Sequence, residues 1–255
     1  PSGDRGGSKE VLEGTDGGAA ASGASATARR PKPVRVEAVI VNYRTADLTE
    51  ACLRALARDR REEIALFVTV VDNASGDGSA ERLEALVRRE SWQTWVQVLA
   101  SMHNGGFAAG NNVVIRKVLA ADDPPAYVLL LNPDTEPRVG AISALVDFME
   151  AHPEAGLAGS RLEDPDGTPQ RSAFRFHSIL GELENAVRLG ILTRLLSRWA
   201  VAPPVVDHAI HCDWVSGASV IFRLAVLRDI GTMDEAYFLY FEETDYCLAA
   251  RRAGC

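Results

Sequence analysis

The sequence predicts an α/β fold: a Rossmann-like, mostly parallel sheet with helices on both faces and a smaller, less regular region toward the C-terminus. Apolar, β-branched strand-like runs alternate with helix-like segments from residue 36 to residue 159. The strand-like runs are almost continuously apolar, as in residues 36–43 (VEAVIVNY), which is typical of strands buried on both faces. Polar, turn-forming residues follow four of these runs, at the sheet edge where such folds bind ligands.

The elements follow in chain order from the spacing of apolar residues. In the first helix, Leu48, Cys52 and Leu56 recur at helical spacing and share one side. The predicted strands are 36–43, 64–71, 96–100, 127–131 and a short one near 156–159. The predicted helices between them are 48–57, 80–89, 107–121 and 139–151.

Beyond residue 160 the alternation is less regular. Residues 164–167 (DPDG) predict a hairpin tip, 213–222 a strand and 243–253 a last helix. Residues 180–199 predict an amphipathic helix or a pair of helices that also carries three arginines. That segment could lie on a membrane interface, although packing against the domain is the simpler explanation.

The N-terminal residues differ from the rest in composition. Residues 1–30 are rich in Gly, Ala and Ser and contain no aromatic residue, so 1–33 are expected to form a flexible tail. The remaining chain is expected to form one domain in two halves, 34–160 and 161–255. Because the chain begins at Pro1 without a Met and stops at Cys255 within a predicted helix end, we expect a fragment truncated at its C-terminus.

Composition narrows the function classes. The formal net charge of −8 opposes nucleic-acid binding, which needs a positive surface. The four cysteines form no C-x-x-C pair, which argues against a zinc ribbon or a disulfide scaffold. The five histidines show no metal-ligand spacing, and no G-x-S-x-G motif supports a serine hydrolase. No apolar run approaches the ~18–20 residues that span a bilayer.

Two clusters could bind a nucleotide. Asp72 ends the second predicted strand, where its carboxylate could accept an N–H from a pyrimidine ring or cap the next loop. Residues 104–112 (NGGFAAGNN) open a helix directly after a strand, which suits close approach of phosphate but is also typical of a glycine-rich turn. The latter segment is neither G-x-G-x-x-G nor a P-loop, which disfavours NAD or a Walker site.

Two acidic clusters could carry the chemistry. Asp134, in Asn132-Pro133-Asp134, could hold Mg²⁺ or Mn²⁺ together with nucleotide phosphates, or it could cap the following helix. Glu242 and Glu243 open the last helix, where the helix dipole stabilises acids and where a general base could stand. They point roughly 100° apart, so we expect one of them to face the pocket. We expect the aromatic run at 237–241 to pack and hold these acids in place.

Six motifs occur in the order of a known family: VNY, VVDNASGDGS, NGGFAAGNN, LLLNPDT, WVSGASVIFR and FLYFEETDYCLAARRAG. Over about residues 36–254 the chain resembles the family 2 glycosyltransferases of the GT-A fold, and its branch looks like the bacterial rhamnosyltransferase-like enzymes of cell-envelope polysaccharide assembly. The resemblance implies inverting, metal-dependent transfer of a sugar, with rhamnose as a candidate, from a nucleotide-diphosphate donor. The acceptor would be a hydroxyl of a cell-envelope glycan or of a lipid-linked glycan.

The resemblance also implies roles for individual residues. The nucleotide-sugar-binding residues would be Val41, Asn42, Tyr43, Asp72, Asn73, Asn104, Gly106, Phe107, Asn111, Asn132 and Asp134, with Asp134 also reaching Mg²⁺ or Mn²⁺. The acceptor and sugar side would be shaped by Trp214, Ser216 and Gly217. Glu243 matches the position of the base in that family, with Glu242 or Asp245 as the alternatives for a shared role. The first half of the domain would thus bind the nucleotide sugar, and the second half would bind the acceptor and carry the catalytic acid.

The sequence departs from the family pattern at the metal element, which has one acid where some relatives have two. Relatives also usually carry a His metal ligand beyond the last helix, where this chain stops.

Two alternative functions stay open. One is a sugar nucleotidyltransferase, for which residues 41–47 offer only Arg44 as a basic residue to bind phosphate, and the other is a non-catalytic nucleotide-sugar-binding module. The expected location is the cytoplasm, with peripheral contact at the inner face of the cell membrane as one option.

Overall fold

The structure, a computed structural model, describes residues 32–176 and 201–255. Its helices are α1 (Ala46–Asp59), α2 (Ser79–Arg89), α3 (Gly106–Ala120), α4 (Ala141–Ala151), α7 (Leu224–Ile230) and α8 (Glu242–Arg252). Its strands are β1 (Val34–Asn42), β2 (Ile64–Asp72), β3 (Val96–Ala100), β4 (Tyr127–Leu131), β5 (Leu157–Gly159), β6 (Leu162–Glu163), β7 (Pro169–Gln170), β8 (Ala173–Phe174), β9 (Trp214–Val215) and β10 (Ser219–Arg223). The helix expected at 180–199 and nearly all of the expected tail lie outside the described residues.

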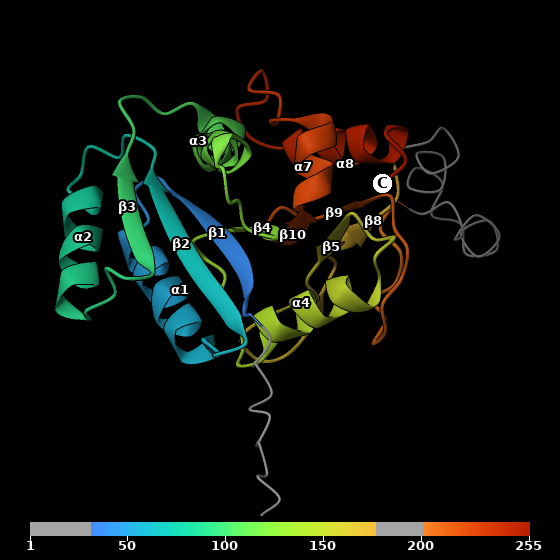
Figure 1. Ribbon diagram of the computed structural model, residues 1–255, viewed down its shortest axis with the longest axis horizontal. Helices are drawn as coiled ribbons and strands as arrows, with labels where there is room; N and C mark the ends of the chain where they lie inside the picture. Colours follow the sequence, from blue (N-terminus) through green and yellow to red (C-terminus); the bar gives the residue numbers. More distant parts are fainter. Residues whose placement is uncertain (1–31, 177–200) are drawn as a thin grey trace, which may run out of the picture. The chain divides into compact units, whose positions relative to one another are not determined.

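A six-stranded sheet in the order β3-β2-β1-β4-β10-β5 lies at the centre of the domain. Strands β1 to β4 run parallel to one another, whereas β10 pairs antiparallel with both β4 and β5. The prediction of a mostly parallel sheet is therefore confirmed. Because β10 lies between β4 and β5, late residues of the chain complete a sheet that early residues begin (Figure 1).

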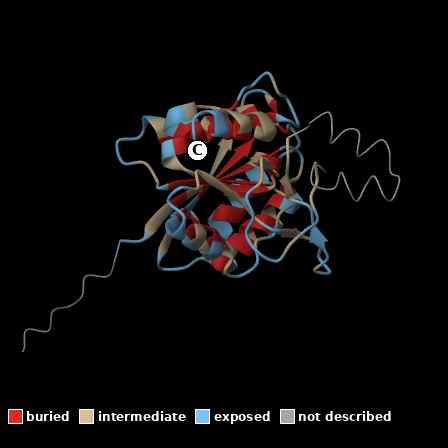
Figure 2. Cartoon of the chain, turned by 90° about the vertical axis from the view of Figure 1, so that its right-hand side faces the viewer, coloured by how far each residue is buried: buried red, intermediate tan, exposed pale blue. Residues whose placement is uncertain are grey.

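Two helical layers cover this sheet. Helices α1, α2 and α4 pack on one face, and α3, α7 and α8 pack on the other (Figure 1). Successive side chains of a strand point to opposite faces, so Ala38 and Ile40 join the α1 side of the core while Val39 joins the α3 side. Figure 2 shows the buried strands between the two helical layers. The carboxyl ends of β1 to β4 thus meet at one edge, as the sequence predicts.

The predicted strand at 213–222 is wrong as a single element. β9 pairs with β8 in a small separate sheet, and β10 begins only at Ser219. Between them the Ser216 amide donates to Ser172 O, 2.9 Å away, and the Ser216 hydroxyl accepts from the Ala218 amide at 3.3 Å. The Ser216–Ser172 bond continues the β8–β9 register by one pair, and the chain then turns before β10 pairs with β4.

The start of α4 is held by a residue distant in sequence. The Asp59 side chain, at the end of α1, is buried and accepts hydrogen bonds from the backbone amides of Gly140 and Ile142, the latter at 2.9 Å. Asp59 therefore satisfies two of the free amides at this helix end. The alternative expectation that Asp134 caps this helix is wrong, because the cap belongs to Asp59.

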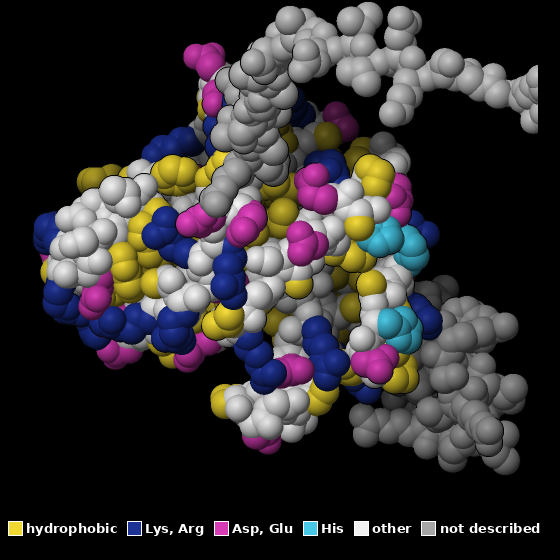
Figure 3. Space-filling model, turned by 60° about the horizontal axis from the view of Figure 1, so that its bottom comes forward, with side chains coloured by type: hydrophobic (Ala, Val, Ile, Leu, Met, Phe, Trp, Pro, Cys, Tyr) yellow, Lys and Arg dark blue, Asp and Glu magenta, His cyan; other side chains and the backbone are white. Residues whose placement is uncertain are grey.

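All four cysteines are free, and burial raises the pKa of the Cys247 thiol to about 12. Within the described ranges, no helix has the length and apolarity to span a bilayer. On the face shown in Figure 3, Lys and Arg side chains are interspersed with Asp and Glu.

Candidate active site

Asn42 and Asp72 meet at the ends of neighbouring strands, as predicted. The Asn42 amide donates to Asp72 Oδ1 at 2.6 Å, and the Ser75 hydroxyl and amide donate to the two Asp72 oxygens at 2.6 and 3.1 Å. Thr49 Oγ1 donates to Asn42 Oδ1 at 2.9 Å. All four residues are buried. The contacts from Ser75 show that Asp72 caps the following loop, and its role toward a nucleotide stays a prediction.

Asn73, Asn104 and Gly106 form a second group, at the entrance to α3. The Asn73 side-chain amide donates to Asn104 Oδ1 and to Gly106 O, at 2.9 and 2.8 Å. The Gly106 amide donates to the same Asn104 oxygen at 2.9 Å. Gly106 has a φ of +82°, and a Cβ there would lie 2.0 Å from Phe238 O. Only glycine fits this position, because both the backbone angle and the close approach exclude a side chain.

Asn111 carries a free acceptor beside this group. Its side-chain amide donates to Phe107 O at 3.0 Å, but its buried Oδ1 has no hydrogen-bond partner in the part of the chain that the structure describes. A buried polar atom without a partner costs about 1–3 kcal/mol, so this oxygen points to a ligand that donates to it. The Phe107 amide donates to Phe238 O at 3.0 Å and fixes the start of the helix.

Val41 and Tyr43 lie at the same edge but differ in environment. A Cβ on Gly110 would lie 2.7 Å from Val41 Cγ1, so the Val41 side chain packs against α3. Tyr43 is 42% exposed, and the Arg44 guanidinium lies 5.2 Å from its ring centroid. Of these two predicted site residues, the Tyr43 ring is therefore the one that a ligand can contact from solvent.

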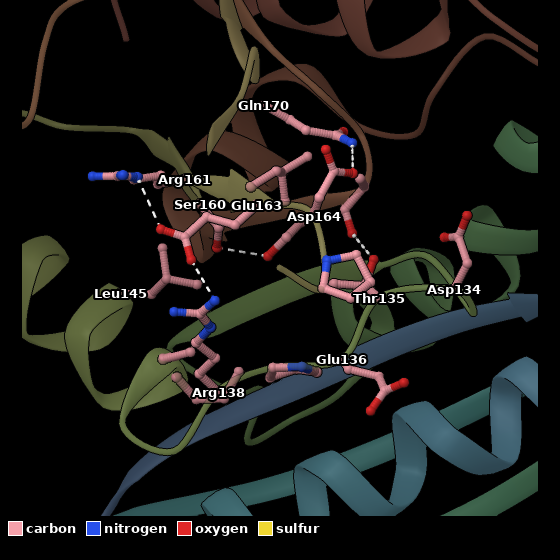
Figure 4. A pocket seen from close by; sticks show the side chains of 17 residues that line it. Asp134, Thr135, Glu136, Arg138, Leu145, Ser160, Arg161, Glu163, Asp164 and Gln170 are labelled. Atoms are coloured by element: carbon pink, nitrogen blue, oxygen red, sulfur yellow. Dashed lines mark hydrogen bonds and ion pairs between the residues drawn. The ribbon is translucent and has the colours of Figure 1, made fainter. Parts of the chain in front are cut away.

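Asp134 is exposed on a turn just beyond β4. The Thr135 amide donates to Asn132 O at 3.1 Å, and the Asn132 amide and Thr135 hydroxyl donate to Ala218 O at 2.9 and 3.1 Å. This turn borders a cavity of about 470 Å³, seen in Figure 4. The cavity is lined by Asp134, Thr135, Glu136, Pro137, Arg138, Ala141, Ile142, Leu145, Ser160, Arg161, Leu162, Glu163, Asp164, Pro165, Gln170, Ala218 and Ser219.

The cavity combines polar side chains on two sides with an apolar wall from α4. Glu163 pairs with Arg138 at 2.6 Å and with Arg161 at 3.3 Å. Ser160 Oγ and Ser219 Oγ lie 2.7 Å apart on another side (Figure 4). Four acidic and two basic side chains line it, which disfavours an anion and suits an uncharged, hydroxyl-rich ligand.

Glu242 and Glu243 both begin α8, and each has a buried Oε2 with no hydrogen-bond partner among residues 32–176 and 201–255. Glu243 lies near Gly217 and Phe107: a Cβ on Gly217 would lie 3.8 Å from Glu243 Cβ and 3.4 Å from the Phe107 ring. Burial raises the pKa of Glu243, and the neighbouring charge of Glu242 raises it further, against backbone hydrogen bonds that lower it. A carboxylate shifted in this direction suits a general base.

The prediction that the aromatic run packs and holds these acids is wrong. Phe238, Leu239, Tyr240 and Phe241 are all more than half exposed. Tyr240 and Phe241 both have a φ of +71°, a conformation that turns the chain sharply into α8. Contact with the α3 entrance is made by the backbone of Phe238, so the acids owe their position to the helix start and to the neighbouring Gly217.

The predicted acceptor-side residues divide into two kinds. The Trp214 indole donates to Arg175 O at 3.1 Å and stacks on Phe174 with ring centroids 4.2 Å apart. Ser216 is bonded within the turn before β10. Gly217 is the one of the three that lies beside Glu243, so it is the best placed of them to border a sugar.

The residues around Asp134 have the chemistry of ligands for a hard divalent cation. In the described ranges, no group of three or more His, Cys, Asp or Glu residues is placed to hold a metal ion alone. Asp134 and Glu136 are exposed carboxylates on the loop that borders the cavity. Hard oxygens of this kind fit Mg²⁺ or Mn²⁺ when phosphate oxygens supply the remaining ligands. The donor set therefore fits a cation shared with a bound diphosphate.

Asn112 is a residue at this site that sequence reasoning missed. It is buried, its amide donates to Met233 O at 2.9 Å and to Glu235 at 2.8 Å, and its Oδ1 accepts from the Met233 amide at 2.9 Å. It thereby ties α3 to the segment that leads to α8. The Asn-Asn pair was the available signal, but it does not tell which asparagine binds the chain and which carries a free oxygen.

Comparison with known proteins gives the family. The model of the family described as Glycosyl transferase family 2 matches residues 37–200, more than half of the chain. Among curated proteins, the chain is 28% identical over 225 residues to the N-acetylglucosaminyl-diphospho-decaprenol L-rhamnosyltransferase of Mycobacterium tuberculosis (strain H37Rv), covering 85% of this chain and 70% of that protein.

Solved structures share the fold. The mannosyltransferase PcManGT from Pyrobaculum calidifontis, in complex with GDP-Man and Mn²⁺, aligns with a TM-score of 0.54 and 16% identity, over 84% of this chain and 51% of that one. S. aureus TarS 1-349 in complex with UDP aligns with a TM-score of 0.55 and 19% identity, over 86% and 56%. The chain thus spans about half the length of the solved structures it matches. The chain belongs to glycosyl transferase family 2, and its described residues form a nucleotide-sugar-dependent glycosyltransferase domain with the GT-A fold.

Proposed function

We propose that this domain is an inverting, metal-dependent hexosyltransferase. It moves a sugar from a nucleoside-diphosphate donor to a hydroxyl of a cell-envelope glycan or a lipid-linked acceptor. The observation that carries the proposal is the half-buried Glu243 side chain, which lies beside Gly217 and whose buried Oε2 has no hydrogen-bond partner among the described residues. Residues 34–160 form the nucleotide-sugar-binding half, and 161–255 form the acceptor and catalytic half.

The donor lies along the carboxyl ends of β1 to β4. The free Asn111 Oδ1 accepts a hydrogen bond from the nucleotide, and the amides at the start of α3 face its phosphates. The Asn42–Asp72–Ser75 network keeps the ends of β1 and β2 in register. It leaves the exposed Tyr43 ring beside the nucleobase of the donor. The predicted donor residues are therefore divided between direct contact and support.

Glu243 acts as the base. Its carboxylate takes the proton of the acceptor hydroxyl while that oxygen attacks the anomeric carbon and the bond from this carbon to the diphosphate oxygen breaks. Attack opposite the leaving group inverts the anomeric configuration in one step and needs no covalent intermediate. Burial helps because it raises the pKa of Glu243 and makes its carboxylate a better proton acceptor.

Asp134 is the residue that would hold a divalent cation, Mg²⁺ or Mn²⁺, with Glu136 near enough in sequence to assist. When bound, the cation neutralises charge on the departing diphosphate. The cavity next to Asp134 receives the donor sugar, because its polar side chains and the apolar wall from α4 suit a hexose. Rhamnose is the first sugar to test, since the M. tuberculosis relative is a rhamnosyltransferase.

That relative's name also specifies a diphospho-decaprenol acceptor, so a lipid-linked glycan is the acceptor we propose, used from the cytoplasm at the inner face of the cell membrane. Nucleic acid is not among the proposed partners.

Isothermal titration with UDP-, dTDP- and GDP-sugars and Mn²⁺ tests donor binding. Binding of none of them would refute the proposal. Glu243→Gln should abolish turnover but leave the donor Kd within about twofold, because the substitution keeps the size of the side chain and removes its basicity. Glu81→Gln, on the exposed side of α2, is the matched control and should keep full activity. Donor binding without turnover in the parent chain would favour the non-catalytic module.

A further inference from the structure

An unusual surface lies next to α8. Phe238, Leu239, Tyr240 and Phe241 are 57%, 53%, 69% and 61% exposed, and Met102 is 96% exposed. These five residues, called the apolar rim here, are five of the eleven exposed large hydrophobic residues in the described ranges. Single exposed apolar side chains are ordinary, whereas a contiguous group indicates an interaction surface.

Four consecutive residues, 238–241, form most of the rim, and the loop that carries Met102 leads to the place where α3 meets Phe238. Met102 precedes the α3 entrance, where the backbone of Gly106 touches that of Phe238 and the Phe107 amide donates to Phe238 O at 3.0 Å. The rings of the second loop point outward because Tyr240 and Phe241 both adopt a φ of +71°. Bulky residues rarely take this conformation, and strained segments of this kind cluster where proteins contact ligands.

The position of the rim connects it with the acceptor; this step rests on the proposed function. The residue after Phe241 is Glu242, and Glu243 is the proposed base. An acceptor hydroxyl must reach Glu243 from the side opposite the departing diphosphate. The surface beside α8 therefore lies on the acceptor's route, and an apolar surface there suits an apolar part of the acceptor's surroundings.

The charged residues near the rim indicate which kind of acceptor surroundings it can contact. The rim contains no Lys or Arg, and the charged residues that flank it in sequence are acidic, namely Asp234, Glu235 and the acids at the start of α8. These acids repel anionic head groups, so binding to a bilayer must come from burial of apolar area in neutral lipid. Aromatic and aliphatic side chains without basic neighbours bind by burying apolar area in the head-group and acyl-chain boundary.

We propose that the apolar rim docks on the surface of a lipid bilayer. Docking inserts its side chains at the acyl boundary and brings Glu243 to the height at which the sugar of a lipid-linked acceptor leaves the membrane.

Vesicle flotation tests this directly. The chain should float with neutral phosphatidylcholine vesicles, equally at low and high salt, because the contact is apolar. The double variant Leu239→Ser/Tyr240→Asn should lower the partition coefficient at least about tenfold, since it removes two large apolar side chains. Asparagine is chosen because it tolerates a positive φ. Phe67→Ser, which removes a 47% exposed ring from β2, is the matched control and should bind like the parent.

A kinetic readout completes the test. With a lipid-linked acceptor in vesicles the double variant should raise the acceptor KM, whereas with a water-soluble short-chain acceptor its kcat/KM should match the parent's. No flotation of the parent chain would overturn the proposal. So would equal loss of activity on both acceptors with flotation unchanged, which would make the rim a saccharide contact. Failure of the proposed function is distinct, because it abolishes donor binding and leaves flotation intact.

Discussion

Replacing Gly106 by alanine tests the contact that joins the proposed donor site to the segment before α8. The substitution adds one methyl group at a backbone φ of +82°, in a place where the Cβ would lie 2.0 Å from Phe238 O. Ordinary van der Waals contact begins at 3.4 Å, so the two backbones must separate by roughly 1.4 Å. That separation breaks the 3.0 Å hydrogen bond from the Phe107 amide to Phe238 O.

The magnitude has three parts. The left-handed backbone conformation costs alanine about 1 kcal/mol. The lost hydrogen bond removes about 1 kcal/mol. Forcing packed segments apart costs about 1–3 kcal/mol. The free energy of unfolding should therefore fall by about 3–5 kcal/mol, a large share of a domain's total stability.

Gly78→Ala is a close control because it isolates the cost of placing alanine in the left-handed backbone conformation. Gly78 has a φ of +84° and also stands at a helix start, but a Cβ there would meet nothing within 4 Å. Urea titration followed by circular dichroism should give a loss of about 1 kcal/mol for this variant. Isothermal titration with a nucleotide-sugar donor should show weakened binding for Gly106→Ala and unchanged binding for Gly78→Ala.

Two results would refute this reasoning. Equal stability losses in the two variants would mean that the close approach to Phe238 contributes nothing. Unchanged donor binding in a folded Gly106→Ala protein would mean that the α3 entrance is not part of the donor site.

Three further predictions concern individual side chains. Glu243→Gln should raise the Tm near neutral pH. Burial raises the folded-state pKa of Glu243, so the parent protein loses stability as pH rises through that pKa. The difference in Tm between the variant and the parent should therefore close on acidification, which a pH series of thermal melts would show. A gap that widens on acidification would contradict this. Asp59→Ala should lower the free energy of unfolding by about 2–4 kcal/mol in urea titrations, because it leaves two amides of α4 unpaired. Asp77→Ala, at the exposed start of α2, is the control and should lower it by about 0.5–1 kcal/mol. Similar losses in the two variants would count against a structural role for Asp59. Asn111→Ala should weaken donor binding about tenfold in titration calorimetry and barely change the free energy of unfolding. Asn112→Ala should lower the free energy of unfolding by about 2–3 kcal/mol. The reverse pattern would make Asn112 the donor contact and Asn111 the structural residue.

The sequence was sufficient for the parts of the fold that depend on local pattern. The apolar runs that become β3 and β4 have the predicted bounds, and polar residues at the strand ends predicted the edge where Asn42 and Asp72 meet. The family and the GT-A fold followed from six ordered motifs and are confirmed by the family match and the solved structures.

What could not be predicted depends on distant partners. The break between β9 and β10 arises because β9 pairs with β8 whereas β10 pairs with β4 and β5, and the α4 cap comes from Asp59 at the end of α1. The seven-residue α7 was missed because so short a helix leaves little periodicity. Residues 237–241 were expected to be buried because they are apolar, but two left-handed residues turn the rings outward, and apolarity does not reveal backbone angles.

The place of β10 has a consequence for how the chain is made. One edge of β4 pairs with β10, with Leu131 opposite Ser219, so this edge waits for 88 further residues to leave the ribosome. At 5–20 residues per second the wait is about 4–18 s, during which a strand destined to be wholly buried has an unpaired side. Unpaired apolar edges recruit other chains. The nascent domain is therefore most prone to aggregation between the synthesis of β4 and that of β10.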